Sequence, residues 1–213
     1  MSVGALVKRA LGRAFPAAVL VKGARAQTPR VALTFDDGPH PGHTPAILDI
    51  LDAHDARATF FLQGAEAEKH PGLAREIAAR GHQVGNHGYS HYDARKVPLG
   101  IYLADVDRAR DTLQNVLGTK LEPIFRPPHG SVTGPSFVAL ARHGYRFVFW
   151  SADSRDSFIR SRPELVEHVA SLGVSDGDIL LLHEDYPHTV EALADIVGLI
   201  RGRSLGFVAI RDL

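Results

Sequence analysis

Two adjacent carboxylates and two histidines are the residues of this chain whose types and spacing most suggest chemistry. Asp36 and Asp37 end an apolar run and are followed by a Gly-Pro turn. Adjacent residues that leave a strand point in different directions, so one carboxylate can bind a metal ion while the other faces a water molecule. His87 and His91 are four residues apart. That spacing lets both imidazoles reach one ion if the segment makes a helical turn.

Each pair also has a simpler structural interpretation. An Asp before a glycine is commonly a hydrogen-bond acceptor in a turn. The chain has 12 histidines among 213 residues, so a pair at this spacing is easily found by chance. The location of the two pairs favours the metal-binding interpretation, because each pair directly follows a run of strand-forming residues.

The composition restricts which ligands a metal could have. The chain has no cysteine, so a metal must be held by His, Asp or Glu. Two histidines and one aspartate leave coordination positions for water and substrate, as a catalytic site requires. We therefore expect a divalent metal, with Zn²⁺ as the first choice. Ligand type does not separate it from Co²⁺, Ni²⁺, Fe²⁺ or Mn²⁺.

Three further polar segments also follow apolar runs. Arg126 precedes a Pro-Pro-His-Gly turn. Its guanidinium can pair with a carboxylate while the turn amides face a developing oxyanion, although a solvated Arg in a surface loop is the simpler alternative. His183 ends the apolar run 179–182, which suits a general acid or base or a structural hydrogen-bonding group. The acidic segment 153–156 taken alone fits a helix-capping loop.

Short β-rich runs alternate with longer helical patterns from Arg30 to the C-terminus. This alternation predicts an α/β fold with a parallel sheet and outer helices, either an open doubly wound sheet or a closed or nearly closed barrel. In both architectures active sites lie at the carboxyl ends of strands, where the polar residues described above are found. The expected strands are Val31–Phe35, Ala58–Leu62, Gln83–Gly85, Ile124–Phe125, Tyr145–Trp150, Asp178–Leu182 and Gly206–Ile210, and the expected helices are Thr44–Ala53, Ala65–Arg80, Tyr102–Leu117, Pro135–Arg142, Pro163–Leu172 and Thr189–Ile200.

Length and composition indicate one folded domain. A chain of 213 residues with 45% hydrophobic content can bury a full core. The 24 basic and 24 acidic residues cancel, so no global field would recruit nucleic acid. No run approaches the roughly 20 apolar residues that a membrane-spanning helix needs. We expect an N-terminal extension over residues 1–29 and a domain over residues 30–213.

The N-terminal extension has three interpretations. Residues 1–16 combine an apolar helical stripe with basic residues off it, which is typical of a basic amphipathic helix in peripheral contact with a membrane surface. A helix packed on the domain is the plain structural alternative. A secretory signal is the third, because Ala24-Arg25-Ala26 resembles a cleavage site. The cytoplasm or the inner face of the membrane is the favoured location, with secretion as the alternative.

The motifs in this order resemble those of the polysaccharide deacetylase family, also called carbohydrate esterase family four. The family includes chitin, chitooligosaccharide and peptidoglycan N-acetylglucosamine deacetylases. The resemblance runs from Arg30 to the C-terminus. It implies a distorted, incomplete (β/α) barrel with about seven parallel strands. It also implies a metal-dependent hydrolase that removes the N-acetyl group from the sugars of an N-acetylated glycan and releases acetate.

The resemblance assigns a role to each motif. It implies that a water molecule deprotonated by the general base attacks the acetamide carbonyl, and that a general acid then protonates the leaving amine. By this resemblance, Asp36 would be the base, oriented by Arg126, and the metal ligands would be Asp37, His87 and His91. The acid would be His183, paired with Asp156. Leu181 would contact the acetyl methyl group, and the substrate-binding turn, with its oxyanion-binding amide, would be formed by Pro128, His129 and Gly130.

Three positions depart from the family pattern. Gly88 stands where Ser or Thr is usual, Ser157 where Trp is frequent, and His129 where Tyr or Phe is frequent. None of them removes a ligand or an acid or base group. The sequence leaves two alternative functions. One is an O-acetyl esterase of the xylan type, which could use the same residues. The other is a catalytically silent glycan-binding domain, in which a metal ligand or the base would be expected to be missing.

Overall fold

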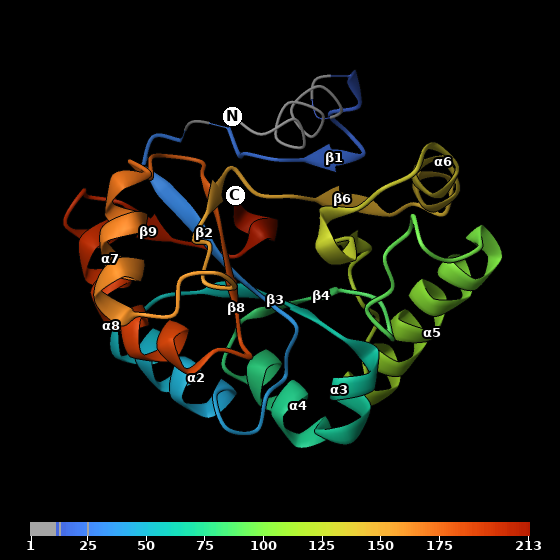
Figure 1. Cartoon of the computed structure of the whole chain (residues 1–213), viewed down its shortest axis with the longest axis horizontal. Helices are drawn as coiled ribbons and strands as arrows, with labels where there is room; N and C mark the ends of the chain where they lie inside the picture. The colour runs from blue at the N-terminus through green and yellow to red at the C-terminus, as the bar shows by residue number, and fades with distance from the viewer. Residues whose placement is uncertain (1–11, 13, 25) are drawn as a thin grey trace.

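The computed structural model describes residues 12, 14–24 and 26–213 (Figure 1). The predicted amphipathic helix over residues 1–16 lies largely outside the described residues, so its contact with a membrane remains a prediction. In the described part, helices form an outer layer around a curved sheet (Figure 1). None of the described helices is both long and apolar enough to cross a membrane.

Nine strands in the described chain form one sheet in which all paired strands run parallel. Their order is β1-β6-β5-β4-β3-β2-β8-β7, and β9 pairs with β2. Because this order ends on β1 at one side and β7 at the other, the barrel is left incomplete, as predicted. The strands are β1 (Val19–Leu20), β2 (Arg30–Asp36), β3 (Ala58–Leu62), β4 (Gln83–Asn86), β5 (Ile124–Phe125), β6 (Arg146–Val148), β7 (Ala152–Asp153), β8 (Ile179–His183) and β9 (Gly206–Phe207).

All seven predicted strands are present, with changes at their ends. The strand expected over Tyr145–Trp150 is shortened to β6, and the one expected over Gly206–Ile210 ends at Phe207, before a 3-10 turn at Ile210–Asp212. Two strands were not predicted, β1 and β7. Each has two residues, which is too short to carry a periodic pattern. β1 lies within the predicted N-terminal extension and pairs with β6.

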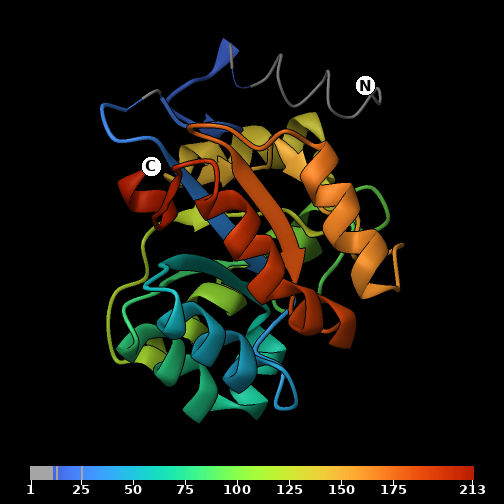
Figure 2. The same ribbon diagram turned by 90° about the vertical axis from the view of Figure 1, so that its left-hand side faces the viewer.

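The helices also follow the prediction with one correction. A single helix was expected over Ala65–Arg80, but the chain forms two, because Pro71 cannot continue a helix and restricts the residue before it. In Figure 2, α7 and α8 lie side by side on the outside of the sheet. The helices are α2 (Thr44–Ala53), α3 (Gly64–Lys69), α4 (Pro71–Ala79), α5 (Leu99–Leu117), α6 (Gly134–Arg142), α7 (Arg162–Ser171) and α8 (Pro187–Arg201), with a short 3-10 turn at Pro128–Gly130.

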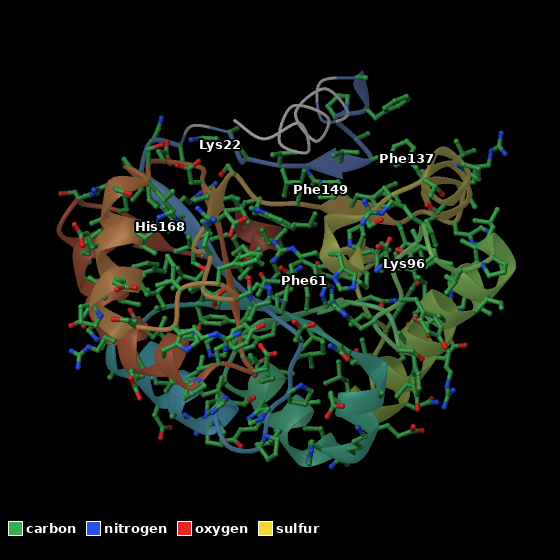
Figure 3. The ribbon with its side chains drawn as sticks, in the orientation of Figure 1. Lys22, Phe61, Lys96, Phe137, Phe149 and His168 are labelled. Atoms are coloured by element: carbon green, nitrogen blue, oxygen red, sulfur yellow. The ribbon has the colours of Figure 1, made fainter. Side chains whose placement is uncertain are left out.

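Alternating residues of β2 face opposite sides of the sheet. Leu33 and Phe35 belong to the large cluster that packs under the outer helices. Ala32 belongs to a smaller cluster with Phe61, which Figure 3 labels near the middle of the ring of strands. Asp36 has the same parity as Ala32, so the last residue of β2 carries its carboxylate toward the interior of the barrel.

Candidate active site

Asp37, His87 and His91 converge at the carboxyl ends of β2 and β4. Asp37 Oδ1 lies 3.5 Å from His87 Nε2 and 3.1 Å from His91 Nε2. Ligand atoms of the three residues all lie within 4.8 Å of one another. Among the described residues, this is the one group of three or more His, Asp or Glu side chains with such geometry. The structure therefore brings together the three predicted ligands.

The protonation states of these groups fit a divalent metal. His87 Nδ1 lies 2.7 Å from the carbonyl oxygen of Arg126. Because a carbonyl only accepts, Nδ1 carries a proton, and Nε2 is the ring nitrogen that faces Asp37. Burial and the neighbouring His87 lower the pKa of His91 to about 4, so that this imidazole is neutral at neutral pH. Two imidazoles and a carboxylate are a donor set that suits zinc.

Asp37 is held in its ionised form by its surroundings. Burial opposes ionisation, but the nearby histidines, His87 first, and the hydrogen bond from Gln63 lower the pKa of Asp37 below its usual value. Gln63 Nε2 donates to Asp37 Oδ1 over 2.8 Å. Gln63 thus orients the carboxylate from the end of β3, a role that no sequence motif predicted.

The segment from His87 to His91 is a loop rather than the helical turn that the four-residue spacing suggested. Gly88 has φ +78° and His91 has φ +56°, so two of its residues adopt left-handed backbone. The carboxylate of Asp105, in α5, accepts the backbone N–H of Tyr89 over 2.8 Å and that of Ser90 over 3.0 Å. A Cβ atom at Gly88 would come within 3.1 Å of Asp105 Oδ2. Asp105 therefore braces the loop that presents His91.

We expect Asp105→Ala to weaken metal binding by about tenfold to a hundredfold, because groups that hold metal ligands in place typically contribute that much. Asp105→Asn keeps one acceptor oxygen and should lose less. Competition with a chromophoric chelator measures the affinity. Asp111→Ala, a change of an exposed carboxylate on the same helix, is the matched control. An unchanged affinity in Asp105→Ala would show that the loop is held without this carboxylate.

Asp36 lies beside the three ligands and is bound by Arg126. Arg126 Nη1 donates to Asp36 Oδ1 over 2.8 Å, which leaves Oδ2 at 3.7 Å from His87 Nε2. Arg126 is fully buried, and it also donates to Thr34 Oγ1 over 2.8 Å and to the carbonyl oxygens of Val148 and Phe149 over 3.2 and 3.1 Å. Hydrogen bonds from Nε, Nη1 and Nη2 therefore hold the guanidinium in place. They orient Asp36 so that its second oxygen faces the cavity.

Next to Asp36, at the end of the neighbouring strand β8, His183 is paired with Asp156. His183 Nδ1 lies 2.7 Å from Asp156 Oδ1, and Asp156 Oδ2 accepts the backbone N–H of His183 over 2.8 Å and the hydroxyl of Thr189 over 2.9 Å. Burial disfavours the imidazolium, but the hydrogen bond and charge of Asp156 outweigh it and raise the pKa of His183 to about 9. His183 is therefore protonated at neutral pH, with Nε2–H left to donate.

These groups line one cavity of about 420 Å³. Most of the predicted residues line it, including Leu181, His129 and Gly130, whereas Arg126, Asp156 and Pro128 are buried and are not part of the lining. The full lining is Asp36, Asp37, His87, His91, His129, Gly130, Trp150, Asp153, Ser157, Phe158, Leu181, His183 and Tyr186. The position after Asp156, where the family frequently has Trp, is thus a serine on the cavity wall.

Glu184 is a buried residue of the site that sequence reasoning missed. Its backbone N–H donates to Asp36 O over 3.0 Å, and its side chain accepts the hydroxyl of Thr44. A Cβ atom at Gly38 would lie 1.8 Å from Glu184 Oε1, so only glycine fits above this side chain. Burial raises the pKa of Glu184 to about 8, which favours the neutral acid at neutral pH. Glu184 thereby ties the end of β8 to the turn that carries both aspartates.

Comparisons with known proteins agree with this geometry. Residues 23–148 match the family model described as polysaccharide deacetylase. The chain is 34% identical to a peptidoglycan-N-acetylglucosamine deacetylase of Bacillus cereus, over 86% of this chain and 87% of the relative, and 32% identical to a chitooligosaccharide deacetylase of Azorhizobium caulinodans, over 85% and 84%. The crystal structure of the Bc1960 peptidoglycan N-acetylglucosamine deacetylase matches with a TM-score of 0.87 and 31% identity, over 95% of each chain. The chain belongs to the polysaccharide deacetylase family.

Proposed function

We propose that this protein is a metal-dependent hydrolase that removes the N-acetyl group from the sugars of an N-acetylated glycan and releases acetate. The observation that carries the proposal is the arrangement of three groups around one cavity: the Asp37, His87 and His91 cluster, the free oxygen of Asp36 beside it, and the His183–Asp156 pair at the end of the neighbouring strand β8. Metal ligands, a base and an acid that face one space are what hydrolysis of an amide requires.

Asp36 is the group that takes a proton from the attacking water. The hydrogen bond from Arg126 Nη1 to Asp36 Oδ1 fixes which carboxylate oxygen points toward the cavity. A divalent ion held by Asp37, His87 and His91 would polarise the acetamide carbonyl and acidify a water molecule. We propose zinc for that ion, with cobalt, nickel, iron and manganese as ions that the same ligands accept.

His183 is the group that protonates the leaving nitrogen. Addition of water to the carbonyl carbon is followed by cleavage of the C–N bond, and the amine departs with the proton from His183 Nε2. In the Pro128–Gly130 turn, the N–H groups of Gly130 and Ser131 already donate to Pro127 O and Pro128 O. The N–H of His129 is therefore the turn amide that we assign to the oxyanion.

The pH dependence of the reaction should reveal the Asp156–His183 pair. Since His183 must be protonated to act as the acid and its pKa is about 9, we expect kcat/KM to fall as the pH rises through about 9. Asp156→Asn removes the charge that raises this pKa, so the basic limb should move toward neutral pH. Initial rates between pH 5 and 11 measure both profiles. A basic limb at the same pH in both proteins would remove His183 from the role of acid.

The substrate class follows from the family and from the site. The relatives named above are deacetylases of peptidoglycan N-acetylglucosamine and of chitooligosaccharides, so we propose a glycan that contains N-acetylglucosamine. The test is acetate release from N-acetylated chitooligosaccharides, peptidoglycan fragments and O-acetylated xylan, with a chelator and with metal added back. Release from the N-acetylated glycans alone supports the proposal. Release from xylan alone would make the protein an O-acetyl esterase, and no release from any glycan would favour a silent binding domain.

A further inference from the structure

One large apolar side chain lies on the rim of the catalytic cavity. Phe158 is 75% exposed, more than any other large hydrophobic side chain of the described residues, and the next, Ile101, is 51% exposed and outside the cavity lining. Single exposed hydrophobic residues are common on protein surfaces. The location of Phe158 sets it apart, because an exposed aromatic ring beside a polar reaction centre is placed to contact what binds there.

The backbone holds Phe158 in this outward position. Asp156, two residues earlier, is fully buried and bonded to His183, and Ile159, the next residue, packs against the main core. The N–H groups of Phe158 and Ile159 both donate to the carbonyl of Arg155, over 2.9 and 2.8 Å. Because its neighbours on both sides are anchored inside, the Phe158 ring is presented by a fixed turn, so little conformational freedom is lost when a ligand covers it.

The space around the reaction centre is elongated. A second cavity of about 470 Å³ shares Asp37, His91 and Tyr186 with the first, and Phe158 belongs to the lining of the first cavity alone. The metal-ligand cluster therefore lies between two hollows rather than at the bottom of one. Such a shape suits a chain of sugars that passes over the cluster better than it suits a single sugar.

The chemistry of a sugar ring matches what surrounds Phe158. A pyranose has faces of C–H groups and an edge of hydroxyls, so it can pack one face on an aromatic ring while polar groups bind its edge. Asp153 and Ser157 line the same cavity as Phe158. We propose that Phe158 is a platform for the sugar adjacent to the one that reacts, and that it makes affinity depend on the length of an N-acetylated oligosaccharide. This inference rests on the proposed deacetylase function.

The test compares the metal-loaded wild type with Phe158→Ala, Phe158→Tyr and the control Ile101→Ala on two substrates, the fully N-acetylated N-acetylglucosamine tetrasaccharide and 4-nitrophenyl acetate. For the tetrasaccharide, we expect Phe158→Ala to raise KM by about fivefold to tenfold, the loss of one stacking contact, with kcat changed less than about twofold. Phe158→Tyr should restore KM, because it keeps the ring. With 4-nitrophenyl acetate, which has no second sugar, all four proteins should behave alike.

An unchanged KM for the tetrasaccharide in Phe158→Ala would overturn the platform, and so would an equal rise in KM for 4-nitrophenyl acetate. Failure of the proposed function gives a different result, because the wild type would then release no acetate from the tetrasaccharide. In that case calorimetric binding of the tetrasaccharide to wild type and Phe158→Ala still decides the question. Weaker binding to the variant supports the platform, and equal binding overturns it.

Discussion

Asp36→Asn is expected to keep its bound metal and to lose turnover by about a hundredfold to ten-thousandfold, the usual contribution of a positioned general base. Asparagine retains a side-chain oxygen that can accept the hydrogen bond of Arg126 Nη1, which spans 2.8 Å in the wild type. It has no basic oxygen to take a proton from water. The three ligands are untouched, so the effect should appear in kcat rather than in metal content.

Metal content by mass spectrometry and acetate release by a coupled assay would be measured on the same sample of Asp36→Asn. Asp195→Asn makes the same chemical change at an exposed ion pair with Arg162 and should match the wild type in both measurements. Loss of metal from Asp36→Asn would place Asp36 among the ligands instead. Retained turnover would mean that another group accepts the proton.

His87→Ala should lower metal content and activity together. His87 is buried at the end of β4, and its Nε2 is one of the three atoms that face the candidate metal position. Removal of one of three protein ligands leaves two, which is below what catalytic zinc sites use. We expect turnover to fall at least a thousandfold, because the polarising ion, and with it a water acidic enough to react, is lost.

Activity measured after metal removal by a chelator, and again after metal is added back, distinguishes Asp36→Asn from His87→Ala. Wild type should lose activity with a chelator and regain it with zinc, whereas His87→Ala should not recover at the same zinc concentration. His143→Ala, an exposed histidine on the turn after α6, is the control for the substitution itself. Equal metal loss in Asp36→Asn and His87→Ala would contradict the division of roles between them.

The alternation of strands and helices predicted a parallel α/β sheet and the convergence of its polar residues, and the resemblance to the family selected the incomplete barrel. Parallel strands bring their carboxyl ends to one edge, so residues as distant as Asp37 and His183 could be placed together once their strands were recognised. Ala58–Leu62 was predicted to the residue, because five consecutive residues of a β-rich run have the length of a buried strand. Residue type and position after a strand predicted two histidines and one carboxylate of the Asp36–Asp37 pair as ligands, and the resemblance to the family selected Asp37.

The supporting contacts could not be predicted in the same way. Asp105 lies in the middle of a long helix, and nothing in its local pattern indicates that a loop 15 residues earlier binds to it. Gln63 contacts Asp37, and Glu184 contacts Asp36, only because the strands pair in one particular register. β1 and β7 have two residues each, so their strand conformation comes from the partners with which they pair. These features depend on tertiary geometry, which a periodic pattern does not contain.

The four hydrogen bonds of Arg126 link the aspartate at the end of β2 to the chain just after β6, two parts of the barrel that do not pair directly. Catalytic alignment and the integrity of the scaffold therefore depend on one side chain. Lysine could not take its place, since a single ammonium cannot span the four acceptors that a planar guanidinium reaches. A substitution that removes the guanidinium would leave the buried Asp36 without its charged partner, so it should lower activity and stability together.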